Sequence, residues 1–551
     1  MKKYIGFLTI ALSLALTSCN DWLDKLPDDR ATVDSKKKVD LLLVSAYPLQ
    51  SPDFMMEQSS DNVLDNGKQY TFQPIQDQCY RWNPIDVASN DSPYYVWLTH
   101  YMAVAAANQA LASIEKLGSG EELNGEKAEA LLCRAWAIFR LSNAFCMAYD
   151  PTKAGSYQGL PYPKEPGVSI TERGTLEELY QNINEDIETA IPLLDDAHLS
   201  VPKYHFNAKA AYAFAARFNL YYHKYDKAIQ YATAALGEKP AGVLRDLAGM
   251  MTLAGVDDIS NAYIRSSSPA NLLEIDSYST LGRAQFSNNY KRFATNMTVL
   301  ERELFWATMP WGTSSDPNTL YYSHLMYGSS QAVRFPKLEE YFEVTDKVNQ
   351  TGKMHIVDVV LTTDEALLVR AEAYALRNQA GDVEKSLADV NLWISSHCAE
   401  RRTSSSGKTA TRPTMTVESL NNFMESIPYS ALIPESNLQR TIKKHLVPQG
   451  FTVAEGTQEN LIQFILHLRR LETWQQGLRF QDIKRYGIAF SHIIDGESPV
   501  VFKAGDLRGA LQIPADVIAA GMNPNLYEEP VVQEQAPTEE EQSGRYVHFT
   551  K

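Results

Sequence analysis

Three of the eight tryptophans, Trp82, Trp306 and Trp311, lie outside any helical period of the sequence. They stand among turn formers and polar residues, in the segments 80–84 and 305–312. The flat face of an indole matches the apolar C–H face of a pyranose ring, and neighbouring amide, carboxylate and guanidinium groups can hydrogen-bond its hydroxyls. We therefore predict that at least one of the three indoles contacts a sugar. For any single one, packing of its loop onto a scaffold is an equally good interpretation.

The same loops carry further side chains that could complete such a site. The full set of predicted ligand contacts is Trp82, Asn83, Tyr70, Trp306, Trp311 and Tyr290. Four other tryptophans fall within helical periods and are predicted to be core residues: Trp97, Trp136, Trp393 and Trp474.

No familiar catalytic motif accompanies these aromatic residues. The sequence has no glycine-rich phosphate-binding loop, no G-x-S-x-G nucleophile elbow and no H-E-x-x-H motif. Acid pairs such as Asp195-Asp196 could serve a glycosidase, which needs two carboxyl groups flanking a bond, but 67 acids supply such pairs by chance. We predict a protein without catalytic residues.

No metal centre or cofactor is predicted either. None of the eleven histidines has a second histidine four residues further on, as a helical metal site would require. The segment from Asp61 to Gly67, which includes Asp65 and Asn66, superficially resembles a calcium-binding loop, but its ligand spacing is wrong. Bound calcium is left open.

One acid stands on an apolar helical stripe. Glu472 follows Leu461, Ile465 and Leu468 on the inward face of the helix predicted from Thr457. The favoured interpretation is a buried ion-pair network with the nearby arginines, and the alternative is a catalytic acid. The nearby arginines are Arg469, Arg470 and Arg479.

The N-terminus predicts export. Lys2 and Lys3 precede an apolar run, residues 5–16, which ends at Leu16-Thr-Ser-Cys19. A dozen apolar residues rise only about 18 Å as a helix, too short for a bilayer core of roughly 30 Å. We predict a cleavable signal peptide over residues 1–18 and lipidation of Cys19, since the ending is similar to a bacterial lipobox. No other stretch approaches eighteen apolar residues. We expect a protein that is anchored to a membrane without spanning it.

The composition is that of a large folded chain, with 44% hydrophobic and 21% charged residues among 551. Acids exceed bases by 67 to 51, a net charge of −16, so nucleic acid is not a predicted partner. Two of the remaining four cysteines, Cys133 and Cys146, lie in an apolar helical segment and are predicted to be core residues, whereas Cys79 and Cys398 have no assigned role. No spacing identifies a disulfide, which is left open.

Paired helices dominate the predicted structure. Helical periods cover residues 97–114, 126–147, 208–222, 226–236 and 383–397, and capping boxes open helices at Thr175–Glu178 and Thr362–Glu365. The pairing resembles tetratricopeptide hairpins without a strict 34-residue repeat. We predict a mainly α protein, a single large domain over residues 19–530.

Long insertions separate these hairpins. They are rich in proline, glycine, asparagine, serine and aromatic residues, and they are expected to be ordered loops. The insertions cover residues 57–96, 150–172, 237–360 and 399–456, and a polar tail follows over residues 531–551.

Several motifs, in order along the chain, resemble the SusD/RagB family of outer-membrane lipoproteins from Bacteroidetes. Gln476 departs from the family pattern, which usually has Glu there, so that one charge pairing is in doubt. The motifs are Cys19-Asn-Asp-Trp-Leu-Asp24, Arg134-Ala-Trp-Ala-Ile-Phe139, Gly159-Leu-Pro-Tyr-Pro163, Arg370-Ala-Glu-Ala-Tyr374, Arg469-Arg-Leu-Glu472 with Gly477, Arg479, Asp482 and Arg485, and Ile513-Pro514 with Asn523-Pro-Asn-Leu526.

The resemblance implies a SusD-like fold and a function without chemistry. A lipoprotein at the cell surface would capture an oligosaccharide, or a peptide in some members, and deliver it to a SusC-like TonB-dependent β-barrel transporter of the outer membrane. The family's ligand residues lie in variable loops, so none is carried over. A lipid-anchored glycosidase and a purely structural tetratricopeptide-like adaptor are the alternatives.

Overall fold

The structure is a computed structural model, and it describes residues 33–167, 172–284, 291–313, 320–322 and 325–526. The predicted signal peptide, Cys19 and the tail 531–551 lie outside the described residues. None of the helices in the described ranges combines the length and apolar character that crossing a bilayer requires.

Helices form most of the protein, as predicted, and their hydrophobic faces meet in one large core. The long helices of the body are α6 (Pro93–Lys116), α7 (Asn124–Phe145), α8 (Leu176–Ala190), α9 (Ala208–Tyr221), α10 (Tyr225–Leu236), α15 (Thr363–Arg377), α16 (Asp382–His397) and α18 (Thr457–Glu472). Shorter helices are α3 (Lys36–Leu43), α4 (Asp53–Gln58), α5 (Pro74–Tyr80), α11 (Leu247–Met250), α12 (Val256–Tyr263), α13 (Leu281–Ala284), α14 (Met297–Glu303), α17 (Val417–Ser426), α19 (Leu478–Tyr486) and α20 (Ala515–Ala519).

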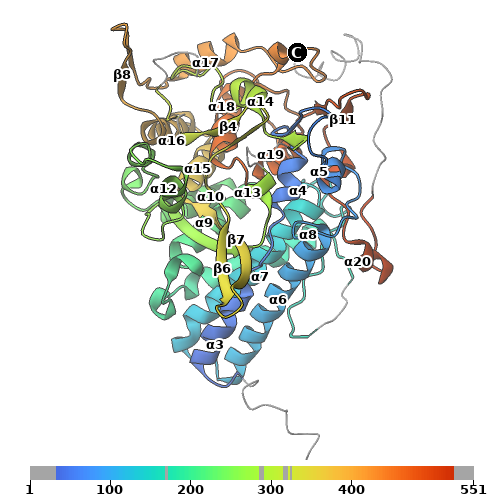
Figure 1. Ribbon diagram of the computed structural model, residues 1–551. Coiled ribbons are helices and arrows are strands. Elements are labelled where there is room, and N and C mark those ends of the chain that lie inside the picture. The colour runs from blue at the N-terminus through green and yellow to red at the C-terminus, as the bar shows by residue number, and fades with distance from the viewer. Residues whose placement is uncertain (1–32, 168–171, 285–290, 314–319, 323–324, 527–551) are drawn as a thin grey trace, which may run out of the picture.

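The predicted hairpins are confirmed. Helix α6 packs on α7, α9 on α10, and α15 on α16, while α10 and α18 also pack on α15 and so join the pairs into one body. In Figure 1, α3, α6 and α7 run side by side in the lower part of the molecule, and α17 and α18 lie at the upper end. The four tryptophans predicted from helical periods are all buried.

The two predicted capping boxes differ in one bond. At the start of α8, Thr175 accepts from the backbone of Glu178 at 3.1 Å, and the Glu178 carboxylate accepts from the Thr175 backbone at 2.8 Å. At the start of α15, Thr362 caps Glu365 at 3.1 Å. The reciprocal bond is missing there because the Glu365 carboxylate instead receives two hydrogen bonds from Arg217, at 2.8 and 2.6 Å.

The insertion predicted as loops over residues 237–360 contains regular structure instead. An antiparallel sheet in the order β2-β7-β6 is built from β2 (Asn271–Ser277), β6 (Tyr341–Asp346) and β7 (Thr351–Thr362). Strand β7 runs directly into α15, so the sheet is tied to the helical body. The sequence analysis missed these strands because it treated the whole insertion as loop on the strength of its turn formers.

The other strands of the described chain form two-stranded sheets. They are β1 (Leu64–Asp65) with β3 (Phe293–Ala294), β4 (Tyr327–Ser329) with β5 (Ala332–Arg334), β8 (Arg401–Thr403) with β9 (Thr409–Thr411), and β10 (Phe490–His492) with β11 (Val500–Phe502). The β1–β3 pair joins the insertion 57–96 to the insertion 237–360, so two loops far apart in the sequence are held together.

Four cysteines are buried and unpaired: Cys79, Cys133, Cys146 and Cys398. The prediction that Cys133 and Cys146 are core residues is confirmed. Burial raises the pKa of the Cys146 thiol to about 11, which keeps it protonated and unreactive at neutral pH.

The buried carboxylate of Glu129 on α7 connects three segments of the chain. Glu129 on α7 accepts from the Tyr47 hydroxyl at 2.7 Å and contacts His205 Nδ1 at 2.6 Å and His198 Nε2 at 2.8 Å. Burial alone would raise the pKa of Glu129, but these contacts lower it to about 2. Burial alone would lower the pKa of His198, but the contact with Glu129 raises it above 6.5.

These shifts predict how stability depends on pH. The stabilisation from His198 is complete below its unfolded pKa of 6.5 and is lost as pH rises through its raised value. That from Glu129 is present above 4.5 and is lost as pH falls toward about 2. His198→Gln should therefore lower the melting temperature more at about pH 5.5 than at about pH 8, as calorimetry would measure. An equal drop at both pH values would contradict the charged contact.

Candidate functional site

The structure corrects the prediction for Trp82, whose side chain is fully buried (0% exposed). Its backbone N–H bonds the carbonyl of Cys79 at 3.1 Å, and the N–H of Asn83 bonds that of Gln78 at 2.9 Å. This is a Schellman motif that ends α5, with Trp82 at the left-handed position (φ 54°) where glycine is usual. The turn formers around Trp82 therefore mark a helix end.

The reversal of the chain places the Trp82 indole in the core. Its N–H donates to the carbonyl of Ser59 at 2.9 Å, and its ring stacks on His492 with centroids 4.5 Å apart. Phe490 and Phe502 of the β10–β11 hairpin pack against it. No ring face is left for a ligand.

Trp311 is also a core residue, at 2% exposed. Its ring contacts Trp393 on α16 and Phe464 on α18, each with centroids 6.2 Å apart. The segment 305–312 thus fastens the insertion to the helical body. The packing interpretation holds for this residue, and the predicted sugar contact does not.

The other predicted contacts have different positions. Trp306, Tyr70 and Asn83 are half-buried, and the Trp306 indole N–H has no acceptor in the described part of the chain. Tyr290 lies outside the described residues, as does Cys19. The structure therefore does not bring the predicted residues that it describes together into one site.

An open polar groove lies where three loops meet; we call it the Asn66 groove. Its cavity volume is about 480 Å³, within the usual range for small-molecule sites. Two of the loops belong to the predicted insertions 57–96 and 399–456. The groove is lined by Leu64, Asp65, Asn66, Gly67, Gln69, Pro434, Glu435, Ser436, Asn437, Arg440, Ile493 and Asp495.

The polar groups of this groove fall into two sets. Those of the floor hold the loops together, and those of the rim are exposed. The Asn66 amide donates to the carbonyls of Lys291 at 3.0 Å and Gln331 at 2.7 Å, so it is fully engaged in joining loops. Gln69, Glu435 and Asn437 are exposed on the rim. Exposed amide and carboxylate groups held on a fixed frame can hydrogen-bond the hydroxyls of a sugar.

The structure does not support the resemblance of residues 61–67 to a calcium loop. Asp61 is buried and forms two hydrogen bonds of 2.7 Å with Arg479. Asp65 accepts from Arg292 at 3.0 and 2.8 Å, and this contact holds its pKa below the ordinary value although burial alone would raise it. Both acids thus have guanidinium partners in place of a cation.

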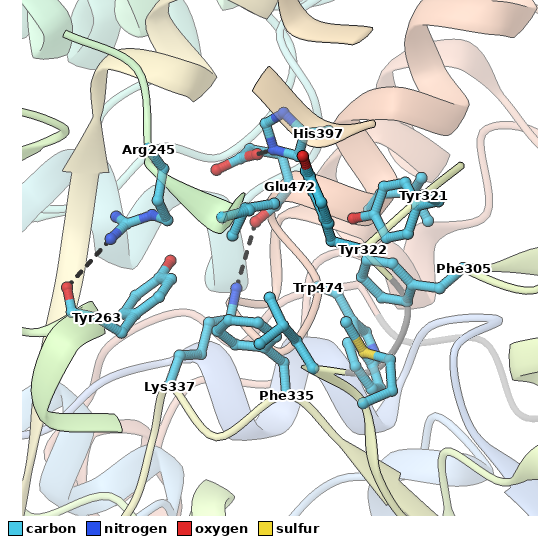
Figure 2. A pocket seen from close by; sticks show the side chains of 14 residues that line it. Arg245, Tyr263, Phe305, Tyr321, Tyr322, Phe335, Lys337, His397, Glu472 and Trp474 are labelled. Carbon is cyan, nitrogen blue, oxygen red and sulfur yellow. Dashed lines mark hydrogen bonds and ion pairs between the residues drawn. The ribbon is translucent and has the colours of Figure 1, made fainter. Parts of the chain in front are cut away.

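A second, much smaller pocket lies between the insertion 237–360 and the helical body; we call it the Lys337 pocket. Its cavity volume is only about 40 Å³, room for a few water molecules. Figure 2 shows Lys337 pointing toward Glu472 between two groups of side chains. The lining residues are Arg245, Leu247, Tyr263, Phe305, Tyr321, Tyr322, Leu325, Met326, Phe335, Lys337, His397, Leu471, Glu472 and Trp474.

Glu472 belongs to this pocket and not to the arginine network predicted for it. Its carboxylate contacts His397 Nε2 at 3.1 Å and accepts from the Trp393 indole at 3.3 Å. The network itself exists without Glu472: Arg469 pairs with Glu372 and Asp482, Arg470 with Asp61 and Glu303, and Arg479 with Asp61. Glu472 is the last residue of α18, and its side chain is buried, as the periodicity predicted. Only its partners differ from the prediction, since they come from α16.

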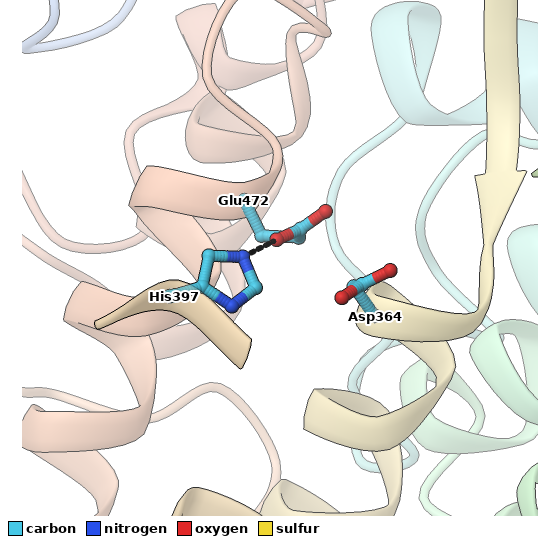
Figure 3. A group of neighbouring side chains, drawn as sticks. All are labelled: Asp364, His397 and Glu472. Atoms are coloured by element: carbon cyan, nitrogen blue, oxygen red, sulfur yellow. Dashed lines mark hydrogen bonds and ion pairs between the residues drawn. The ribbon is translucent and has the colours of Figure 1, made fainter. Parts of the chain in front are cut away.

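Asp364, Glu472 and His397 form the one group in the described ranges whose ligand atoms lie close enough to hold a metal ion, all within 4.8 Å of one another (Figure 3). Burial and the charge of Glu472 raise the pKa of Asp364 to about 6. Asp364 also accepts from the backbone N–H of Arg245 at 3.1 Å, and the cationic side chains of Arg245 and Lys337 line the same pocket. Two cations beside the group oppose a third, so these acids fit hydrogen bonding better than metal binding.

Residues 21–220 match a SusD-like family model described as starch-binding and associating with the outer membrane. A SusD superfamily protein from Bacteroides vulgatus ATCC 8482 is 18% identical, over 89% of this chain and 98% of that chain, with a TM-score of 0.58. One from Bacteroides thetaiotaomicron VPI-5482 is 19% identical, over 89% and 98%, at 0.53. A laminarin-binding SusD-like protein is 14% identical, over 89% and 98%, at 0.50. No curated protein matches the sequence.

The fold and the groove define a helical binding scaffold that presents polar loops. The predicted resemblance to the SusD/RagB family is confirmed by the family model over residues 21–220, and the fold is similar to that of SusD superfamily structures. The sequence analysis missed the rim residues Gln69, Asn437 and Asp495 because they are scattered over three loops, and no local pattern brings them together.

Proposed function

We propose that this protein binds an oligosaccharide in the Asn66 groove and delivers it, without chemical change, to a SusC-like TonB-dependent transporter. The SusD-like family and its starch-binding description support glycan binding, as does the laminarin-binding neighbour. The observation that carries the proposal is the groove itself: it is open, its volume is about 480 Å³, and exposed polar side chains line its rim. Peptide uptake is the alternative, since amide and carboxylate groups also bind peptide backbones.

Asp65, one of the carboxylates of the groove, is not suited to be the acid of a hydrolase. A glycosidase needs one carboxyl group that is protonated near neutral pH. Asp65 is held ionised by Arg292 and also accepts from the backbone N–H groups of Gly67 at 2.8 Å and Asp495 at 2.9 Å. It therefore serves the frame of the groove. We propose that the protein is not an enzyme.

Removing two rim amides should weaken binding. Gln69→Ala combined with Asn437→Ala removes two neutral hydrogen-bonding groups, each contributing about 1 kcal/mol, so affinity should fall about tenfold or more. Titration calorimetry would measure it, after a screen of starch-, laminarin-, xylan- and pectin-derived oligosaccharides identifies a ligand. Gln181→Ala, an exposed glutamine on α8, is the matched control and should change nothing. Unchanged affinity in the double variant would remove the groove from the site.

Tyr70 is the predicted aromatic contact that directly follows a lining residue of the groove, Gln69, in the sequence. Its half-buried ring follows Gln69, so Tyr70→Ala should weaken the same ligand by about 1–3 kcal/mol if the ring stacks on a sugar. Tyr70→Phe keeps the ring and is the control. Calorimetry that finds both variants equal to the wild type would exclude stacking by Tyr70.

Anchoring and partnership follow from the same proposal. A lipid on Cys19 would hold the protein at the outer membrane, facing the cell surface, and a SusC-like barrel would receive the ligand. Cys19→Ala should release the protein from the membrane fraction, and affinity purification from the native membrane should recover a β-barrel partner. A soluble wild-type protein, or recovery without a barrel, would contradict these parts.

A further inference from the structure

An apolar groove lies between α6 and α20, on the right of the view in Figure 1; we call it the Tyr94 groove. Its cavity volume is about 350 Å³, within the usual range for small-molecule sites. Asp516 is the one charged side chain among the described lining residues. The apolar walls are formed mainly by Tyr94, Trp97, Leu98 and Tyr101 of α6 and by Val517 and Met522 on the opposite side.

The groove is preformed, and its apolar side chains are left uncovered. The Tyr101 hydroxyl donates to the carbonyl of Pro161 at 2.9 Å, which fixes the loop that forms the third wall to α6. Tyr94 and Leu98, one turn apart on α6, are still 44% and 39% exposed. An apolar helix stripe normally packs against another element, so this face of α6 lacks a partner in the described part of the chain.

The concave shape of the groove limits what can cover it. A symmetric dimer would place the same groove of two chains face to face, and two hollows leave a void between them. The occupant is therefore a narrow segment that projects apolar side chains. A cationic group in that segment would be favoured beside Asp516.

The chain itself continues next to this groove. Met522 lines the groove, and three residues later the Asn525 amide donates to the carbonyl of Phe145 at 2.9 Å. The Phe145 ring in turn contacts Trp97 of the groove, with centroids 5.7 Å apart. The last described range ends at Leu526, so the residues that follow it in the sequence start beside the groove.

Twenty-five residues follow Leu526, and their composition is uneven. Six glutamates lie between positions 528 and 541, and the carboxylate of Asp516 would repel them. Residues 545–549, Arg-Tyr-Val-His-Phe, contain three apolar side chains, one arginine and no acid. The connecting residues 527–544 can span about 60 Å when extended, so they do not limit the reach of this segment.

We propose that residues 545–549 occupy the Tyr94 groove, with the rings of Tyr546 and Phe549 against the α6 stripe and Arg545 toward Asp516. The segment covers the exposed apolar stripe and gives Asp516 a counter-ion. A weak contact is enough to keep the groove covered, because the connecting residues hold the segment at an effective concentration of the order of 1 mM. The inference does not depend on the proposed function, since the Tyr94 groove and the Asn66 groove share no described lining residue.

A synthetic peptide of residues 543–551 tests the proposal on the full mature protein. Titration calorimetry should show that the peptide binds the variant Tyr546→Ser with Phe549→Ser, whose own segment no longer fills the groove, with a Kd of about 0.1 mM. The wild-type protein should bind the peptide about tenfold more weakly, because its own segment competes at about 1 mM. A peptide in which serine replaces both rings should bind neither protein.

Substitutions in the groove, made in the same double-serine variant, locate the binding. Leu98→Gln should weaken peptide binding about tenfold, and the exposure of Leu98 allows the change without loss of the fold. Asp516→Asn, also at an exposed position, should weaken it about threefold at low salt and less at high salt. Leu41→Gln, an exposed leucine of α3, is the matched control and should change nothing.

Three calorimetric results would overturn the proposal: no binding of the peptide to the double-serine variant, equal binding to the variant and the wild type, or binding unchanged by both Leu98→Gln and Asp516→Asn. Analytical ultracentrifugation tests the other occupant. Dimers of the wild type that Leu98→Gln separates, without any peptide binding, would assign the groove to a second copy of the chain and would also overturn the proposal.

Discussion

Asp61→Asn should lower the free energy of unfolding by about 3–5 kcal/mol, the cost of breaking a buried ion pair from one side. Asp61 is buried between Arg479 and Arg470, at 2.7 and 3.3 Å. Loss of its charge leaves both guanidinium groups without their main counter-ion, since Glu303 reaches only Arg470, at 3.1 Å. The variant should therefore be among the least stable single substitutions in the chain.

Urea unfolding of the wild type and the variant, run side by side, would measure the difference in midpoint. Glu185→Gln is the control, because its pair with Lys164 is largely exposed and should contribute about 0.5 kcal/mol or less. A loss no larger for Asp61→Asn than for Glu185→Gln would mean that the arginine network does not hold the fold. The pKa of Glu303 in this network is lowered to about 2 by Lys444 and Arg470, against the effect of burial, so its stabilisation should persist until strongly acidic pH.

Trp82→Ala should lower the free energy of unfolding by about 3–5 kcal/mol, as expected when a large buried aromatic side chain is removed. The indole fills the space between α5 and the β10–β11 hairpin, where it stacks on His492 and donates to Ser59. The backbone at position 82 is left-handed, a conformation that glycine adopts without strain. Trp82→Gly should therefore be more stable than Trp82→Ala by roughly 1 kcal/mol in free energy of unfolding.

Trp306→Ala is the comparison that separates core from surface. The Trp306 ring is half-buried and its N–H has no acceptor in the described ranges, so its removal should cost clearly less than that of Trp82. Thermal or urea unfolding of the three variants would check the order. If Trp82→Ala unfolds like the wild type, the indole does not support the core as the structure indicates.

The helical body could be predicted from the sequence because its signals are local. The capping box at Thr175 and the apolar stripes of α6 and α9 specify helices within a few turns, and the structure places them within a few residues of the prediction. The strands of the insertion 237–360 could not be predicted in this way. Strand β2 pairs with β7 across about eighty residues, and turn formers in the intervening chain mask the pattern.

The candidate site was harder to predict than the fold. Tryptophan in a segment of turn formers suggested an exposed ring, but the turn at Trp82 is a helix end that points the ring inward. Glu472 was paired with arginines that are close to it in sequence, whereas its partners Trp393 and His397 come from α16. Both errors have one cause: a long-range contact decided the position of a side chain that only local patterns had described.

The structure shows what Gln476, where the family pattern has Glu, contacts. Its amide oxygen lies 3.5 Å from the Lys337 ammonium group, and its amide nitrogen donates to the carbonyl of Val359 at 2.8 Å. The doubtful charge pairing noted in the sequence thus corresponds to a buried lysine without a carboxylate. Neither motif nor composition could have located that lysine, because it belongs to the insertion.

The most direct test is a crystal structure of the mature protein with the oligosaccharide that binds best in the screen. We expect an intact, uncleaved ligand in the Asn66 groove, in contact with Gln69 and Asn437, on a helical frame that does not move. A ligand bound elsewhere, a cleaved product, or the absence of any saccharide that binds would contradict the proposal that these loops hold a glycan for transport.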